Sequence, residues 1–169
     1  MELQRGQTVC FTGHRRIPVE HDRAIRLAAE NAVRDRIMSG CDTFLVGGAL
    51  GFDTLAQLIV LRLRREFTYL RVVMAIPCRE QDARWGEHDR AVYRQLCRLA
   101  DECIVLSEWY TDTCMLERNR FMVEHSGCCI ACWDGQPRGG TAYTVRYAQR
   151  CRVPMINVWP GGNAQLRLI

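Results

Sequence analysis

The stretch Phe44–Asp53 reads Phe-Leu-Val-Gly-Gly-Ala-Leu-Gly-Phe-Asp and passes from an apolar run through three glycines into a segment of helical period. A glycine-rich turn between a buried strand and a helix lets the backbone come close to a ligand. The first N–H groups of the helix and the positive end of its dipole then face an anion. The stretch therefore predicts a strand, a turn and a helix around a phosphorylated small molecule.

Two other apolar runs also lead to glycine: Gly13 follows Val9–Thr12, and Gly139 and Gly140 lie downstream of Cys128–Trp133. Runs of strand length alternate with helical segments along the chain, which is typical of a parallel sheet covered on both faces. The predicted strands are 8–12, 43–46, 71–76, 102–106, 128–133 and 155–158. We therefore expect an α/β fold with a Rossmann-like open, mostly parallel sheet, helices on both faces and ligands at the carboxyl ends of the strands.

Five helices are expected between these strands. The first buries a stripe from Ile25 to Ile37 and ends at Gly40, a typical C-terminal capping residue. The second begins at Asp53 and the fifth near Thr141, each a candidate N-cap. The apolar positions of the other helices predict these inward faces: Leu55, Ala56, Ile59 and Leu63 in the second; Ala91, Val92, Leu96, Leu99 and Ala100 in the third; Met115, Leu116, Met122 and Val123 in the fourth; Ala142, Val145 and Ala148 in the fifth.

The length of 169 residues and the apolar content of 48% predict one domain, 1–169, with a core over about 8–158 and a C-terminal extension over 159–169. No stretch of about 18 or more uncharged apolar residues occurs, and the first residues are polar. We therefore expect a cytoplasmic protein without a membrane partner. A homo-oligomer is compatible with the sequence.

Ten cysteines lie mostly within apolar runs, where a free thiol acts as a small hydrophobe. In a strand, Cys129 and Cys132 would point to opposite faces, which disfavours a shared metal ion. We therefore expect free thiols in a reducing compartment and no metal site.

All 23 basic side chains are arginine. The lysines of a Walker loop and of a Schiff-base enzyme are therefore excluded, whereas guanidinium groups suit bidentate contacts with phosphate. The net charge of +4 is spread along the chain apart from arginines at 62–71. Charge thus makes nucleic acid an unlikely partner without excluding it.

Polar residues follow several predicted strands. His14 and Arg15 come after Gly13, and Arg15 could hold a phosphate, although a solvated turn explains them as well. Asp53 suits a helix cap and a ligand contact equally, while Gly47, Gly48, Ala49 and Gly51 favour the ligand. In the loop 76–85, Pro77, Gln81 and Trp85 could contact a ribose and a base, or Trp85 could simply pack on the core.

Two further segments carry candidates. Asn119 shares the inward helix face with Met115 and Met122, where its amide would bond either to backbone or to the ligand. Asp134–Thr141 joins the fifth strand to its helix. The predicted ligand-binding residues are Gly13, His14, Arg15, Gly47, Gly48, Ala49, Gly51, Asp53, Pro77, Gln81, Trp85, Asn119, Asp134, Gly139, Gly140 and Thr141. The acidic groups that could act in catalysis are Asp53, Glu80 and Asp134, with Asp82 nearby.

These segments together resemble the YpsA-like branch of the SLOG superfamily, which includes the Smf/DprA DNA-processing proteins and the LOG phosphoribohydrolases. The resemblance rests on Cys10–Arg15, the loops 47–53 and 76–85, Arg118–Arg120 and Asp134–Thr141. It implies a nucleotide-derived ligand of the adenine nucleotide, NAD or ADP-ribose type, with no required cofactor. The superfamily hydrolases carry a PGGxGTxxE motif, but here Thr144 occupies the glutamate position and 136–138 replace Pro-Gly-Gly.

Three functions are therefore open: sensing or binding of a nucleotide-derived ligand, cleavage of an N-glycosidic bond in a nucleoside 5′-monophosphate, and binding of single-stranded DNA. Glycosidic cleavage needs a carboxylate near the anomeric carbon. No spacing in the sequence pairs two such groups as general acid and base.

Overall fold

The fold is a six-stranded, all-parallel open sheet with five α-helices, seen in a computed structural model that describes residues 2–162. The sheet has the order β4-β3-β2-β1-β5-β6. Its strands are β1 (Thr8–Gly13), β2 (Thr43–Val46), β3 (Arg71–Ile76), β4 (Glu102–Val105), β5 (Cys128–Cys132) and β6 (Met155–Asn157). The helices are α1 (Val19–Met38), α2 (Phe52–Leu63), α3 (Glu87–Leu99), α4 (Cys114–Glu124) and α5 (Gly140–Arg150). The predicted Rossmann-like architecture is confirmed.

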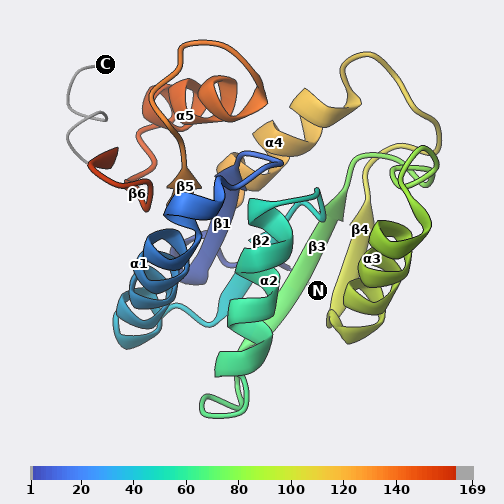
Figure 1. Ribbon diagram of the computed structural model, residues 1–169. Helices are drawn as coiled ribbons and strands as arrows, with labels where there is room; N and C mark the ends of the chain where they lie inside the picture. The colour runs from blue at the N-terminus through green and yellow to red at the C-terminus, as the bar shows by residue number, and fades with distance from the viewer. Residues whose placement is uncertain (1, 163–169) are drawn as a thin grey trace.

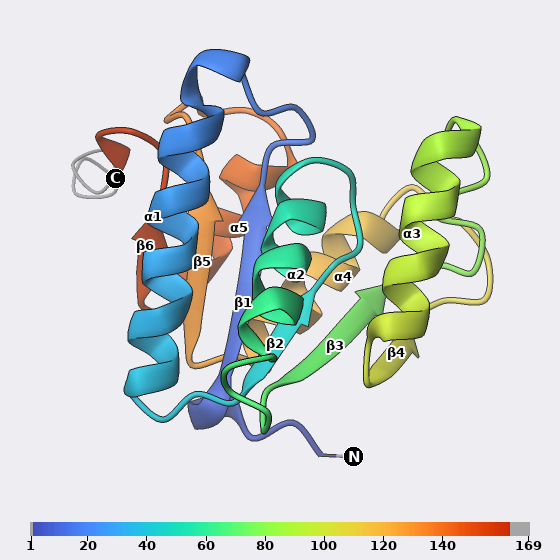
Figure 2. The ribbon, with the colours of Figure 1, turned by 60° about the horizontal axis from the view of Figure 1, so that its bottom comes forward.

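Two layers of helices enclose the sheet (Figure 1). Helices α1, α2 and α3 cover one face, and α4 and α5 cover the other, as the second view also shows (Figure 2). The side chains of β1 alternate accordingly: Val9 and Phe11 pack in the core under α1 and α2, and Cys10 packs in the core under α4 and α5. A strand buried on both faces must be apolar throughout, which is why the sequence marks β1 so clearly.

The two caps predicted at helix N-termini are wrong. Helix α2 has Gly51 as its N-cap and α5 has Gly139, with φ angles of 77° and 99°. Asp53 and Thr141 therefore each lie in the second position of a helix, two residues past the N-cap. Gly40, in contrast, follows α1 with φ 94°, as expected for a residue that ends a helix.

The buried stripe of α3 also differs from the prediction. Ala91 and Leu99 are exposed, whereas Tyr93 and Leu96 are buried. The Tyr93 ring meets Trp85 edge-on at 5.2 Å between ring centroids, and this contact fixes the rotation of the helix. Because β4 is an edge strand, α3 covers only a narrow part of the sheet, and its apolar residues do not all reach the core.

The end of the described chain returns to the sheet. Trp159 lies beyond β6 and its ring contacts the rings of His14 and His21. Of the predicted extension 159–169, residues 163–169 lie outside the described residues. Within 2–162, no helix combines the length and the apolar character needed to span a bilayer.

Candidate functional site

The strand order places a crevice between β1 and β5. From β1 the chain proceeds through β2, β3 and β4 on one side, and β5 and β6 lie on the other. Connections that leave in opposite directions from neighbouring parallel strands open a gap at their carboxyl ends, where ligands of such sheets bind. Gly13 pairs with Cys132 in the ladder, so the residues that follow these two strands face each other across the gap.

A pocket of about 270 Å³ occupies this position. The ends of β1, the β2–α2 loop, α4 and the start of α5 all contribute to it. The predicted ligand-binding residues that line it are Gly13, His14, Arg15, Ala49, Asp53, Asn119, Gly140 and Thr141. Segments distant in the sequence are thus brought together at one rim of the sheet.

A buried pair of opposite charges forms the wall of the pocket. Asp53 and Arg118 are only 6% exposed each. The carboxylate of Asp53 accepts the N–H of Ala49 at 3.2 Å. The guanidinium of Arg118 donates to the carbonyl oxygen of Gly47 and, through Nε, to Oδ1 of Asn119 at 2.8 Å. The pair thus ties α4 to the loop between β2 and α2.

Burial disfavours the charged form of both side chains. It raises the pKa of Asp53, and the attraction of Arg118 and the N–H groups of Ala49 and Gly47 offset part of that effect. It also lowers the pKa of Arg118, an effect that Asp53 opposes. Each group therefore depends on the other to remain charged inside the protein.

Arg118 lines the pocket but is absent from the predicted ligand-binding residues, although the family resemblance rested in part on Arg118–Arg120. Arginine on a helix is normally solvated, so its charge alone does not indicate burial. The spacing of the helix does indicate the burial of Arg118, because it lies four residues from Cys114 and four from Met122, and both of these are buried.

The start of α5 adds further donors to the pocket. Gly140 and Thr141 line it, and they are the first two residues of the helix. The first N–H groups of a helix have no partner within it, so they are available to an anion. A methyl group added to Gly139 or Gly140 would meet no atom within 4 Å, so this turn is open where a guest would approach.

The glycines of the β2–α2 loop serve the packing of the protein itself. Gly51 has φ 77°, and a side chain there would collide with the carbonyl groups of His14 and Arg15. Gly48 has φ 67° and lies against Met74. Gly47, Gly48 and Gly51 do not line the pocket, although they allow the loop that carries Ala49 and Asp53 to lie close to it.

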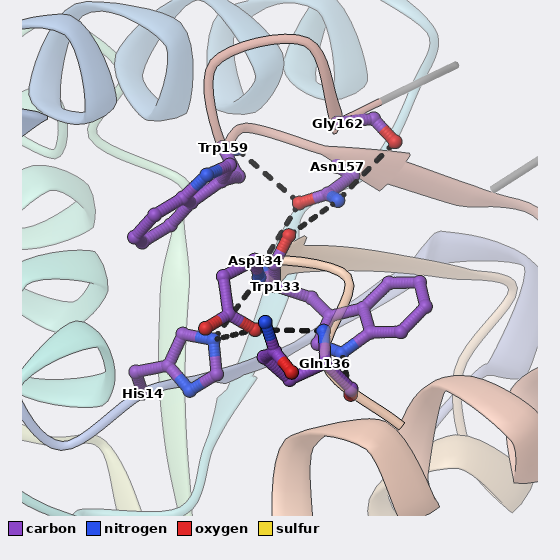
Figure 3. Close-up of polar contacts among 7 residues, drawn as sticks. All are labelled: His14, Trp133, Asp134, Gln136, Asn157, Trp159 and Gly162. Atoms are coloured by element: carbon purple, nitrogen blue, oxygen red, sulfur yellow. Dashed lines mark hydrogen bonds and ion pairs between the residues drawn. The ribbon is translucent and has the colours of Figure 1, made fainter. Parts of the chain in front are cut away.

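His14 and Asp134 close the crevice from opposite strands (Figure 3). Nε2 of His14 lies 3.1 Å from Oδ1 of Asp134 and 3.1 Å from its backbone nitrogen. The Asp134 carboxylate also accepts the N–H of Gln136 at 3.0 Å, which stabilises the turn after β5. His14 lines the pocket, and Asp134 does not line it but contacts His14.

Asn157 of β6 fixes the end of β5, a role absent from the sequence predictions (Figure 3). Its Oδ1 accepts the N–H of Trp133 at 3.0 Å and that of Trp159 at 3.2 Å. Its Nδ2 donates to the carbonyl oxygen of Trp133 at 2.8 Å. An amide that both donates and accepts can replace the ladder bonds that end with the strand, so the position of Asp134 depends on Asn157.

The loop after β3 lies apart from the strand-end pocket. Gln81 is buried and donates to the carbonyl oxygen of Gly48 at 3.2 Å, so it supports the glycine loop. Pro77 is buried as well, and Glu80 is exposed. None of these three lines the pocket. Glu80 is therefore not positioned with Asp53 as a second acid–base group.

Trp85 borders a second hollow of about 530 Å³ between the starts of α1, α2 and α3, which we call the Trp85 cleft. Trp85 and Tyr93 form an aromatic wall, with Leu55 and Val92 among the apolar lining. Arg15 lines both this cleft and the strand-end pocket. The two hollows therefore share one cationic side chain.

Residues 9–155 match the family model described as the YspA SLOG family. The chain belongs to this family. It is 29% identical over 119 residues to the SPbeta prophage-derived protein YoqJ of Bacillus subtilis, a match that covers 63% of this chain and 69% of that protein. It is 25% identical over 130 residues to a UPF0398 protein of Bacillus velezensis, covering 76% of this chain and 71% of the relative.

A solved structure shares the fold. It describes the single-stranded DNA binding mode of DNA processing protein A from Helicobacter pylori, with a TM-score of 0.63 and 22% identity, and the match covers 98% of this chain and 74% of that one. The predicted membership of the YpsA-like branch of the SLOG superfamily is confirmed, and the likeness to DNA processing protein A is one of fold.

Proposed function

We propose that the protein binds a nucleotide-type ligand, with its phosphate in the strand-end pocket and its base in the Trp85 cleft. The single observation that carries the proposal is the pocket between β1 and β5, where the buried Arg118, the exposed Arg15 and the N-terminus of α5 converge. Guanidinium and helix N–H groups are the typical protein partners of phosphate. Thr12 and Thr141 add hydroxyl groups suited to a sugar.

The sizes of the two hollows support a ligand with two parts. At about 270 Å³ the strand-end pocket lies just under the usual range of roughly 300–1,000 Å³ for small-molecule sites. The Trp85 cleft, at about 530 Å³, falls within that range and offers aromatic and apolar surface to a base. Arg15 lines both hollows, so its guanidinium group can reach a phosphate of a ligand that spans them.

A ligand panel tests this proposal by thermal denaturation and calorimetry. Inorganic phosphate, ribose 5-phosphate, AMP, ADP-ribose and NAD present the parts of the ligand separately and together. At a concentration of 100 times the dissociation constant, a ligand adds about 2.7 kcal/mol to the free energy of unfolding. For a chain of this size that corresponds to a rise in midpoint of roughly 5–11 °C. No shift and no heat with any member of the panel would contradict the proposal.

Two variants separate the parts of the site. Arg15→Gln should weaken every phosphate-bearing ligand because it removes the charge shared by both hollows. Trp85→Leu should weaken AMP and NAD and leave ribose 5-phosphate unchanged. The matched control is Arg23→Gln, an exposed arginine of α1 that lines neither hollow. Equal effects of Arg15→Gln and Arg23→Gln would show only the loss of a surface charge.

Cleavage of an N-glycosidic bond is a second candidate, favoured by the position of Asp53. Its carboxyl lines the pocket, and burial raises its pKa, as expected of a group that donates a proton. The superfamily glutamate position holds Thr144, whose hydroxyl donates to the carbonyl oxygen of Gly140 at 2.9 Å. Release of free base from nucleoside monophosphates, abolished in Asp53→Asn, would support this activity. Binding without release in the wild type would exclude it for the nucleotides tested.

Single-stranded DNA is a further candidate guest, since the chain shares its fold with a DNA-binding protein and a strand presents phosphates to the same groups. A gel shift with an oligonucleotide at two salt concentrations tests it, because affinity that depends on phosphate contacts falls steeply with salt. Competition by AMP would place the strand in the same pocket. Binding that AMP leaves unchanged would place it elsewhere.

A further inference from the structure

Two cysteines face each other at the edge of the sheet, and neither of them lines the strand-end pocket or the Trp85 cleft. Cys97 lies in the last turn of α3, and Cys103 lies in the edge strand β4. The Sγ atom of Cys103 is 3.7 Å from the carbonyl oxygen of Cys97, and the two thiol groups hydrogen-bond to each other. Only the short turn at 100–101 separates the two elements, so the thiols are held together by local structure.

This pair differs from the other cysteines in its exposure. All ten cysteines lie within the described residues, and most are buried: Cys10, Cys41, Cys78, Cys114, Cys128, Cys129 and Cys132. Contacts between thiols also occur at Cys10 with Cys129 and at Cys78 with Cys114, but these lie in the core. Cys97 is half-buried and Cys103 is exposed, so the pair is within reach of a small oxidant.

The environment of Cys97 favours its thiolate form. The thiol of Cys103 and the hydroxyl of Tyr93 donate hydrogen bonds to the Cys97 sulfur, and they lower the pKa of Cys97 to about 7 against the opposing effects of burial and of Asp82. Burial instead raises the pKa of Cys128 to about 11. A thiolate reacts with oxidants and a thiol does not, so Cys97 is the chemically active sulfur of this group.

We propose that Cys97 and Cys103 form a site of reversible oxidation, in which Cys97 attacks a peroxide and Cys103 completes a disulfide. The Cys97 sulfur bonds to one oxygen of hydrogen peroxide, the O–O bond breaks, and the departing hydroxide takes a proton to become water. Cys103 then attacks the sulfur of the Cys97 sulfenic acid, the S–O bond breaks, and a second water leaves with the Cys103 proton. The two thiols together lose two electrons, and the peroxide gains them.

The disulfide would act on a residue that supports the ligand site. Once Cys97 is oxidised, the hydroxyl group of Tyr93 loses the thiolate that accepts its hydrogen bond. The same tyrosine meets Trp85 and lies against Gly48 in the glycine loop. Oxidation should therefore change the fluorescence of Trp85 as well as the state of the two thiols, whether or not a nucleotide binds.

Peptide mapping of the folded protein tests the proposal. After exposure to hydrogen peroxide and alkylation of the remaining thiols, trypsin separates Cys97 in residues 95–98 from Cys103 in residues 99–118. We expect these two peptides to be joined with the loss of two hydrogens, and dithiothreitol to release them. Because residues 99–118 also contain Cys114, fragmentation of the joined peptides must place the bond at Cys103.

Three cysteine variants distinguish this pair from general thiol oxidation. Cys103→Ser should leave a sulfenic acid on Cys97 that a dimedone probe traps, and Cys97→Ser should abolish that adduct and the cross-link. Cys151→Ser, the matched control at another half-buried cysteine, should keep the cross-link. The rate of alkylation of Cys97 should rise through pH 7. The proposal is overturned if Cys97 reacts no faster than Cys151, or if peroxide yields no bond between residues 97 and 103.

Discussion

Replacing Arg118 by methionine removes the buried cation that faces Asp53. The side chain of Arg118 is 6% exposed, and methionine fills a similar volume without its charge. The loss leaves a buried carboxylate without its partner and the carbonyl oxygen of Gly47 without its donor. Removing one member of a buried charged pair costs about 3–5 kcal/mol. We therefore expect Arg118→Met to lose about that much from the free energy of unfolding.

Urea denaturation at pH 7 measures this loss, and a double variant identifies its cause. With Asp53→Asn the uncompensated charge disappears, so the double variant should be more stable than the sum of the two single losses implies, by about 1–3 kcal/mol. Arg23→Met, on the exposed surface of α1, should change stability by less than about 0.5 kcal/mol.

The pH dependence gives a second readout. Burial already raises the pKa of Asp53, and removal of Arg118 takes away the largest influence that lowers it. A carboxyl with a raised pKa in the folded state favours folding while protonated, and this contribution falls as pH rises through that pKa. The loss caused by Arg118→Met should therefore be smaller at pH 5 than at pH 7. A loss below about 1 kcal/mol, or one independent of pH and of Asp53, would refute this reasoning.

Three other predictions concern the surroundings of the pocket. Gly51→Ala should lower the free energy of unfolding by at least about 1–2 kcal/mol, because the φ of 77° is strained for alanine and the new methyl group would meet backbone atoms. The control Gly86→Ala, at φ −62° and with no atom near the new methyl group, should leave the free energy from urea denaturation unchanged. Asn157→Ala should lower the free energy of unfolding by about 2–4 kcal/mol, because it leaves the buried N–H and C=O groups of Trp133 unpaired. Asn31→Ala, on the exposed side of α1, should not lower it, and equal melting temperatures of the two variants would contradict this prediction. The affinity for ribose 5-phosphate should fall between 50 and 500 mM salt by calorimetry, and an affinity unaffected by salt would argue against a charged phosphate contact.

The strands could be predicted from the sequence to within a residue or so. A parallel strand covered on both faces is a continuous apolar run, and β2, β3 and β5 follow this pattern closely. The location of the site could also be predicted from the sequence, because the carboxyl ends of parallel strands lie at the same edge of a sheet. His14 and Gly140 were expected at the ligand site by this argument, whereas Asn119 was selected by its spacing on the inward face of a helix.

The remaining features depend on contacts between distant segments. Arg118 is buried only because the loop at Gly47 supplies an acceptor 71 positions away. Asn157 acts through Trp133, 24 positions away. The rotation of α3 depends on the packing of Tyr93 against Trp85, which no periodicity encodes. Local patterns indicate which elements form, whereas these partners are determined by the assembled fold.

A crystal structure of the protein soaked with a nucleoside 5′-monophosphate tests the binding site most directly. We predict phosphate density between Gly13 and the first turn of α5, within hydrogen-bond distance of Gly140 or Thr141, and base density beside Trp85. A nucleotide that is bound at another surface, or a crevice between β1 and β5 that stays empty at saturating ligand, would contradict the account.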